Sequence, residues 1–328
     1  MHLSVVERGH FVGLRGSRVV VSADGASLTE CPLNRLKTLT IARDGVGLSS
    51  NLVTQCAARG IRLFFLDFRG QVAAALSGLD QHAVVGVRRG QFETLADDQR
   101  AAFLASAFAR GKIHNQRSVL LYFAKYHRQA GDAHLRPAGA RLHQATEEAK
   151  RATKAADNWR ERLMGVEGAA ASNYWAALAR TSLLGEKFSG RHHRGADDVA
   201  NQALNYGYAV LSSRVWSCIS NAGLEPFAGF LHTERAGKPS LVLDVMEEYR
   251  PWVVDRSLAK LRRLLNSKDG LDTSLKRRLI AEIDGTLARR YPYQGKRVTL
   301  ESIMQRQIYR LSGALIGERH YKPYLFRW

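Results

Sequence analysis

Hydrophobic and polar positions follow two different rhythms along the chain. Up to about residue 80, short apolar runs alternate with glycine turns, which is typical of strands. These runs are Leu3–Glu7, Phe11–Leu14, Arg18–Val21, Thr38–Ala42 and Ile61–Asp67. One short helix is expected to interrupt them, because Ser49 or Ser50 can cap its start and Gly60 suits its C-terminal left-handed position. The N-terminal part is therefore predicted to be β-rich.

The rhythm becomes helical near residue 90. From Asp97 to Arg128, apolar residues recur three or four positions apart, as on one face of a helix. We expect a loop over Gly131–Gly139, which contains Pro137, and then a charged helical stretch from about Ala140 to Leu183. Residues 184–196 are polar and contain glycine, so they are predicted to be a loop. Further helices are expected from Asp197 to Asn221, with Gly223 as a stop, and after Ser240, Asp272 and Thr299.

These rhythms predict an α+β fold, in which a small N-terminal β-sheet domain precedes a larger all-α catalytic domain. We place the β-rich domain at residues 1–88, a linker at 89–96 and the helical domain at 97–328. The chain shows no internal repeat and no low-complexity tract. The aromatic and basic tail, HYKPYLFRW, suits docking onto the body of the protein or onto a partner.

Composition adds a strong positive charge to this picture. The 328 residues carry a net charge of +19, with a pI of about 10.2. Such an excess favours a polyanionic partner, because Lys and Arg release counterions from phosphates. DNA leads RNA and an anionic membrane surface among these partners. No run approaches the roughly 20 apolar residues of a membrane span, and no secretion signal is visible.

The cysteines give no metal or disulfide pattern. Cys31, Cys56 and Cys218 are scattered, which fits neither a disulfide framework nor a CxxC zinc site. They are expected to be buried free thiols in a reducing, cytoplasmic setting.

One histidine and several carboxylates lie close together in the sequence. His232 precedes Asp244, Glu247 and Glu248, and the intervening loop can fold the histidine back. On a helix capped by Ser240, Asp244 shares a face with Glu247 and with Glu248. Hard divalent cations prefer oxygen ligands, so the cluster is a candidate metal site on a phosphate-binding surface. The alternative is an amphipathic helix with a solvated acidic edge.

A third metal ligand would have to come from elsewhere in the chain. Glu167 is the best candidate, because it lies among small and apolar residues in a helix, where an unpaired carboxylate is costly. Pairing of Glu167 with Arg162 or Arg180 is the alternative.

An ordered series of motifs then resembles the CRISPR-associated integrase family, the universal adaptation nuclease that inserts new spacers. The series begins with Lys112 and KIHNQ, continues with Glu167 ahead of NYW, and passes through the basic loop Arg191–Arg194. It continues with the NYGY stretch (205–208), residues 222–226, residues 229–232 and SLVLDVMEEYRPWVVDR. Asp198 departs from the family, which often has proline there. The resemblance covers most of the chain.

The resemblance implies the roles of individual residues. The family's metal-binding glutamate, histidine and last acidic ligand correspond to Glu167, His232 and Glu247, and the metal is Mg²⁺ or Mn²⁺. Asp244 corresponds to an acidic position that supports this catalytic site. Glu248 matches no clear family role and is expected to face solvent.

The implied reaction is metal-dependent phosphoryl transfer on double-stranded DNA. A 3′-hydroxyl of a captured fragment, the prespacer, attacks a phosphodiester at the edge of a CRISPR repeat. The family forms a homodimer through its β domain, and two such dimers flank a dimer of a small ferredoxin-like companion protein in a heterohexamer. Candidates for the DNA path are Lys112, Arg117, Lys187, Arg191, His192, His193, Arg194 and Tyr206, although at least one of Tyr206 and Tyr208 is expected to lie in the core.

Other functions are compatible with parts of this pattern. A non-catalytic DNA-binding scaffold would need only the basic surface, and a general branched-DNA repair nuclease would use the same chemistry with another partner. An RNA-binding protein without chemistry is disfavoured, because the aromatic RNP motifs are absent.

Overall fold

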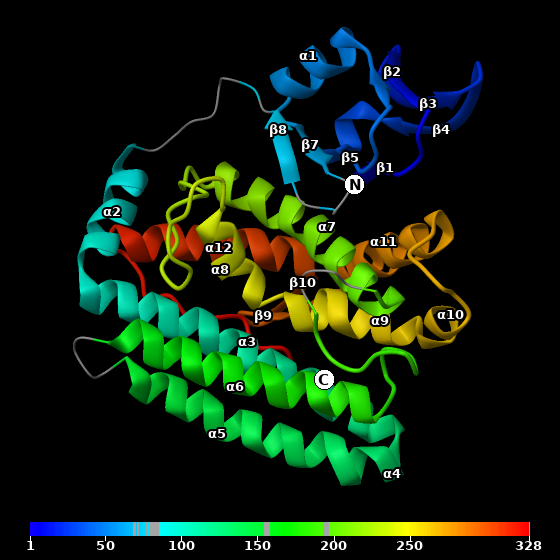
Figure 1. The fold of residues 1–328 in the computed structure, drawn as a ribbon. Coiled ribbons are helices and arrows are strands. Elements are labelled where there is room, and N and C mark those ends of the chain that lie inside the picture. Colours follow the sequence, from blue (N-terminus) through cyan, green and yellow to red (C-terminus); the bar gives the residue numbers. More distant parts are fainter. Residues whose placement is uncertain are drawn as a thin grey trace.

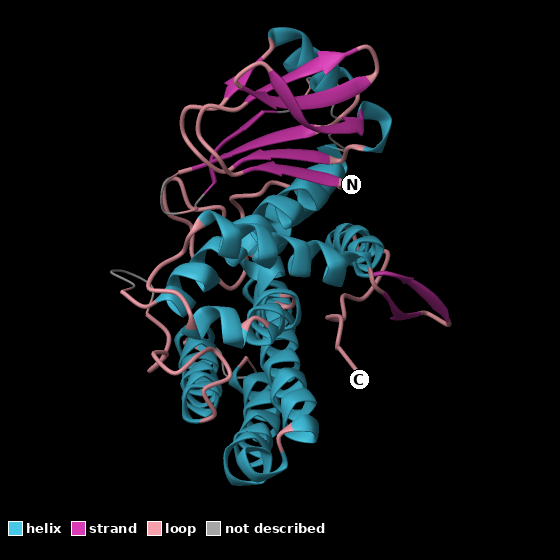
Figure 2. Cartoon of the chain, turned by 90° about the vertical axis from the view of Figure 1, so that its right-hand side faces the viewer, coloured by secondary structure: helices cyan, strands magenta, loops and turns pink. Residues whose placement is uncertain are grey.

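The N-terminal region consists of two stacked sheets (Figures 1 and 2). The structure, a computed structural model, describes residues 1–67, 70, 72–76, 78, 85–153, 158–192 and 197–327. One sheet has the order β1-β5-β7-β8, with β1, β5 and β7 parallel and β8 antiparallel to β7. Its strands are β1 (His2–Val5), β5 (Thr38–Ile41), β7 (Arg62–Leu66) and β8 (Val72–Leu76).

The second sheet has the order β4-β3-β2-β6. Its strands are β2 (Phe11–Arg15), β3 (Arg18–Ala23), β4 (Ala26–Pro32) and β6 (Gly47–Leu48). Helix α1 (Ser50–Ala58) and the short 3₁₀ helix η1 (Leu33–Arg35) complete the region. The Oγ atom of Ser49 accepts a hydrogen bond from the backbone of Leu52, and Gly60 has a φ of +66°, so the predicted helix start and stop are confirmed.

The rest of the described chain is mostly helical, which confirms the predicted fold class. Its helices are α2 (Val85–Ala96), α3 (Asp98–Tyr126), α4 (Arg128–Ala130), the π-helix η2 (Gly131–Leu135), α5 (Arg136–Ala152), α6 (Trp159–Arg180), α7 (Val199–Asn221), α8 (Ser240–Glu247), the π-helix η3 (Arg250–Asp255), α9 (Arg256–Lys260), α10 (Arg262–Asn266), α11 (Thr273–Ala288) and α12 (Leu300–Leu315). A short hairpin, β9 (Arg290–Tyr293) and β10 (Lys296–Thr299), was not predicted and projects from the helical body (Figure 2). Among the described helices, none is long and apolar enough to cross a membrane.

Several predicted boundaries are wrong. The expected loop over 131–139 is helical, because Pro137 lies in the first turn of α5, where its missing N–H is not needed. The helical stretch expected from about Ala140 to Leu183 consists of two helices, α5 and α6, which pack side by side with α3 (Figure 1). Residues 89–96, expected as a linker, lie within α2.

Helix caps explain most of the other helix ends. Asp97, Asp198, Asp272 and Thr299 accept hydrogen bonds from backbone N–H groups in the first turns of α3, α7, α11 and α12. The prediction that Ser240 caps α8 is wrong. Ser240 is the first helical residue, and its hydroxyl donates a hydrogen bond to the carbonyl of Thr233.

The two regions have separate hydrophobic cores. Residues such as Val12, Leu39, Leu52 and Leu63 form the core between the sheets, whereas a larger cluster joins the helices. The three cysteines are buried and free, as expected.

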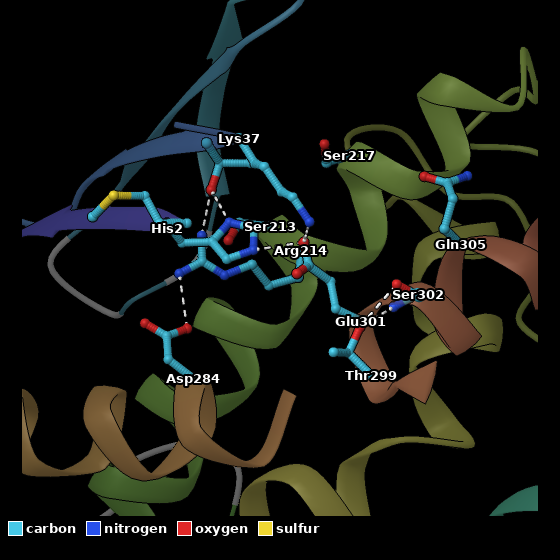
Figure 3. A network of polar contacts seen from close by, with 12 residues as sticks. His2, Lys37, Ser213, Arg214, Ser217, Asp284, Thr299, Glu301, Ser302 and Gln305 are labelled. Atoms are coloured by element: carbon cyan, nitrogen blue, oxygen red, sulfur yellow. Dashed lines mark hydrogen bonds and ion pairs between the residues drawn. The ribbon is translucent and has the colours of Figure 1, made fainter. Parts of the chain in front are cut away.

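A buried polar junction connects the regions (Figure 3). Arg214 on α7, only 1% exposed, hydrogen-bonds Thr38 on β5 and pairs with Asp284 on α11 at 3.3 Å. The Oε1 atom of Glu301 on α12 lies 3.0 Å from Nε2 of His2 and 2.8 Å from Nζ of Lys37. The junction therefore fixes the β1-β5-β7-β8 sheet over α7 and the start of α12.

Candidate active site

The three carboxylates at the end of α8 point to three different places. Asp244 contacts the loop before the helix, Glu247 contacts α3 and the start of η3, and Glu248 contacts the C-terminal tail. All three are buried. The solvated acidic edge that formed the alternative interpretation is therefore wrong.

Asp244 anchors the loop that carries His232. Its Oδ2 atom accepts hydrogen bonds from the backbone N–H groups of Phe230 at 2.5 Å and Leu231 at 2.9 Å. Its Oδ1 atom accepts from the backbone of His232 at 2.9 Å and lies 2.7 Å from Nδ1 of the imidazole. This bond orients the ring and leaves Nε2 available for a ligand, as in carboxylate–histidine–metal arrangements.

Glu167 and Glu247 converge on the ammonium group of Lys112. Lys112 on α3 forms an ion pair with Glu167 on α6, and its Nζ atom lies 2.7 Å from Oε2 of Glu247. The other oxygen of Glu247 is paired with Arg250. Glu167 is therefore paired with Lys112 rather than with Arg162 or Arg180. Residues far apart in sequence thus form one partly buried cluster of alternating charge.

Positive charge controls the ionisation of Glu247. Burial raises its pKa, but Arg250, Lys112 and His232 outweigh burial and bring the pKa to about 2. Burial lowers the pKa of Lys112, but Glu247 and Glu167 outweigh that effect and raise it. The lysine is thus held charged between two carboxylates.

The side chains of Glu167, His232 and Glu247 carry donor atoms of the kind that bind a divalent cation, but among the described residues no group of three or more His, Cys, Asp or Glu side chains is gathered into a metal site. The ammonium of Lys112 lies between the two carboxylates instead. Oε2 of Glu247 is buried and makes no hydrogen bond, although the ammonium is near. Two carboxylates and one imidazole nitrogen are ligands that suit Mn²⁺ and tolerate Mg²⁺.

Glu248 was expected to face solvent, but this prediction is wrong, because its side chain is fully buried against the tail. Its carboxylate accepts hydrogen bonds from the hydroxyl of Tyr321 and, at 3.1 Å, from the backbone of Tyr324. Burial raises its pKa to about 7. The tail therefore docks onto the body of this chain, which was one of the two predicted alternatives.

Asn115 on α3 joins the tail to the end of α8. Its Nδ2 donates to the carbonyls of Glu248 at 2.7 Å and Tyr324 at 2.9 Å, and its Oδ1 accepts from the backbone of Phe326 at 2.9 Å. The side chain is completely buried. The KIHNQ motif indicated this position, but its contacts lie more than a hundred residues away and are invisible in the sequence.

Sequence analysis missed a polar network beside Glu247. Arg250, which pairs with Glu247, lies 4.8 Å from the ring centroid of Tyr208. The hydroxyl groups of Tyr208 and Tyr174 donate to the buried Asp255 at 2.6 and 3.0 Å. Burial raises the pKa of Asp255 to about 6. The spacing of Glu247 and Arg250, three residues on one helical turn, was the available signal.

The residues expected to contact DNA differ in their exposure and in their partners. Lys187 is exposed and pairs with Asp269 at 2.9 Å, and His192 is exposed. Arg191 is half-buried and donates to Asn201 at 2.9 Å and Asn205 at 2.6 Å. His193 and Arg194 lie outside the described residues.

Two of the expected DNA contacts are not at the surface. Tyr206 is 4% exposed, so its ring cannot stack on a base in this conformation, and the core interpretation is the right one for this tyrosine. Lys112 is largely buried within the carboxylate cluster. Its position suits a counter-charge to Glu167 and Glu247 better than a contact with the DNA backbone.

Comparisons with known proteins converge on one family. The family model described as CRISPR associated protein Cas1 matches residues 3–280. A "CRISPR-associated endonuclease Cas1 1" from Francisella tularensis subsp. novicida is 47% identical over 100% of this chain and 99% of its own length. A protein of the same name from Pyrobaculum aerophilum is 33% identical over 99% of both chains.

Solved structures share the fold. A "Casposase bound to integration product" has a TM-score of 0.81 at 18% identity and covers 98% of this chain and 92% of its own. A Cas1 protein from Thermotoga maritima has a TM-score of 0.78 at 19% identity, over 99% and 100% of the two chains. A chain of a "Cas6-RT-Cas1--Cas2 complex" has a TM-score of 0.78 at 20% identity over 100% of this chain and 36% of its own.

Proposed function

Because this chain belongs to the Cas1 family of CRISPR-associated proteins, we propose that it is a divalent-metal-dependent DNA endonuclease and integrase. It joins the 3′-hydroxyl ends of captured DNA fragments to a CRISPR repeat array by transesterification. The observation that carries the proposal is the convergence of Glu167 and Glu247 on the ammonium group of Lys112. The net charge of +19 supports a DNA substrate.

Glu167, His232 through Nε2, and Glu247 are the proposed ligands for Mg²⁺ or Mn²⁺. The bound ion would lower the pKa of the attacking hydroxyl and stabilise negative charge on the phosphate. Asp244 is a positioning residue, because it holds Nδ1 of His232 and the loop on which His232 lies. Arg250 is likewise a positioning residue, because it fixes one oxygen of Glu247.

Membership of the Cas1 family also indicates which proteins this chain binds. We propose that the chain forms a homodimer through its β-rich domain, residues 1–88, and that it assembles with a small ferredoxin-like companion on prespacer and repeat DNA. A solved relative in a Cas1–Cas2 complex supports this assembly. Lys187, Arg191 and His192 remain proposed DNA contacts.

Strand joining in vitro tests this function. The purified chain, with and without the companion, is mixed with a labelled short duplex bearing 3′-hydroxyl ends and a plasmid carrying a repeat array. We expect the label to join the plasmid in Mn²⁺ or Mg²⁺ and to remain free in EDTA. A folded protein that binds DNA but joins no ends in either metal, even with the companion, would instead favour the scaffold function.

Replacing Lys112 with methionine tests whether its ammonium occupies the cation position. In EDTA we expect the variant to lose about 3 kcal/mol of unfolding free energy, because buried carboxylates lose their counter-charge. Urea denaturation with Mn²⁺ should show a larger stabilisation of the variant than of the unchanged protein, since no ammonium competes with the ion.

The matched control is Lys125→Met, at an exposed position of the same helix, which should change neither quantity. An equal response to Mn²⁺ in the Lys112 variant and in the unchanged protein would contradict competition between the ammonium and the metal.

A further inference from the structure

Three hollows merge along the outer face of α12. The first, of about 530 Å³, lies among α12, the β9–β10 hairpin and the tail. It shares Arg306 and Tyr309 with a second hollow of about 510 Å³ at the junction with the β-sheet region. It shares Arg310 and Lys322 with a third of about 350 Å³ beside the tail. We call this continuous depression the α12 groove.

The α12 groove carries a strong excess of positive charge. Among its described lining residues, Glu301 is the single carboxylate, and it is already paired with His2 and Lys37 (Figure 3). Six cationic lining residues make no ion pair within the described part of the chain: Arg59, Arg306, Arg310, Arg319, Lys322 and Arg327. Unpaired cations held along one depression attract a polyanion.

Aromatic rings are interleaved with these cations. Tyr309 is 50% exposed at the point where the first two hollows meet. Tyr293 lines the same depression, with the guanidinium of Arg306 at 6.0 Å from its ring centroid. An exposed ring among backbone-binding cations is the arrangement that binds single strands, because an unpaired base can stack on the ring. A base inside a duplex offers no free face for this contact.

The α12 groove is separate from the carboxylate cluster. Neither Glu167 nor Glu247 nor His232 lines any of its three hollows. The α12 groove therefore lies outside the candidate active site.

We propose that the α12 groove binds a segment of single-stranded DNA outside the catalytic centre. The cations contact the phosphates, and Tyr309 stacks on an unpaired base. This proposal rests on the proposed function, because it takes DNA as the substrate of the protein. It adds a second path for a strand whose duplex is processed elsewhere on the protein.

Fluorescence anisotropy in EDTA tests the proposal without any catalytic step. A labelled 20-nucleotide oligo-dT and a 20-base-pair duplex are titrated with the full chain over a series of salt concentrations. We compare Arg306→Gln/Arg319→Gln/Lys322→Gln with a control of equal charge change on α5, Arg141→Gln/Lys150→Gln/Arg151→Gln. All six side chains are exposed, so both triple variants should fold.

We expect the groove variant to bind oligo-dT with a salt slope shallower by about 2, because each lost phosphate contact removes roughly 0.7 for a single strand. The α5 control should keep the slope of the unchanged protein. Equal losses in the two triple variants would overturn the proposal, because they would reflect net charge alone.

The Tyr309→Ala variant tests whether the α12 groove binds single-stranded DNA or another polyanion. We expect roughly tenfold weaker binding of oligo-dT and unchanged binding of the duplex. Equal weakening for both DNAs would mean that the groove holds a duplex backbone. Unchanged DNA binding in both groove variants, with loss of binding to a poly-glutamate probe, would assign the groove to an acidic protein segment. Because these measurements need no metal, failure of strand joining would leave their outcome intact.

Discussion

Replacing Glu247 with glutamine is expected to slow strand joining by about a thousandfold or more. Glu247 is 2% exposed and its carboxylate forms ion pairs with both Lys112 and Arg250. Glutamine has a similar shape but loses the charge that would hold a divalent ion. Such an ion supplies several kcal/mol of transition-state stabilisation, and each factor of ten in rate corresponds to about 1.4 kcal/mol.

The comparison uses the strand-joining assay under single-turnover conditions, with Mn²⁺ binding followed separately by electron paramagnetic resonance. His232→Ala should behave like Glu247→Gln in both measurements. The matched control is Glu234→Gln, which removes an exposed carboxylate two residues beyond His232 and should leave the rate unchanged. Normal joining by a folded Glu247→Gln protein would show that the chemistry lies elsewhere.

Replacing Asp244 with alanine is expected to lower the free energy of unfolding by about 4 kcal/mol. The substitution leaves three backbone N–H groups and one imidazole nitrogen without their acceptor. A buried donor left unsatisfied costs about 1–3 kcal/mol, and water entering the exposed loop recovers part of the total. Urea denaturation at pH 7 measures the change.

Asp269→Ala provides the matched control for this prediction. Asp269 is almost fully exposed, and its ion pair with Lys187 lies at the surface, so the change should stay within about 1 kcal/mol. A loss below about 1 kcal/mol for Asp244→Ala would mean that residues 230–232 do not depend on this carboxylate. The imidazole ring of His232 would then have to be oriented by a contact other than the one with Asp244.

Local chemistry made much of the fold predictable. Ser49, Asp272 and Thr299 start helices because their side-chain oxygens satisfy free N–H groups, and this signal lies within three residues. Strand β4 (Ala26–Pro32) was missed because its sequence, ASLTECP, offers little apolar alternation. Pro137 misled the prediction because proline marks a break inside a helix but is favoured in the first turn.

The site was less predictable, because its partners are distant in sequence. The resemblance to a family singled out Glu167, His232 and Glu247, and the structure brings the two carboxylates together. Nothing near Glu248 in the sequence indicates burial, since its partners Tyr321 and Tyr324 lie more than seventy residues away. The ammonium of Lys112 between the carboxylates is likewise a product of three helices packing together.

The tail contacts also set an order in time. Asn115 and Tyr324, which meet behind α8, are separated by 209 residues. A ribosome adds about 5–20 residues per second, so Asn115 waits at least about ten seconds for its partner. From the completion of α8 until Tyr321 and Tyr324 are made, more than seventy residues later, the carboxylate of Glu248 lacks both of these partners. We therefore expect the end of α8 to reach its final position only when the last residues of the chain have been made.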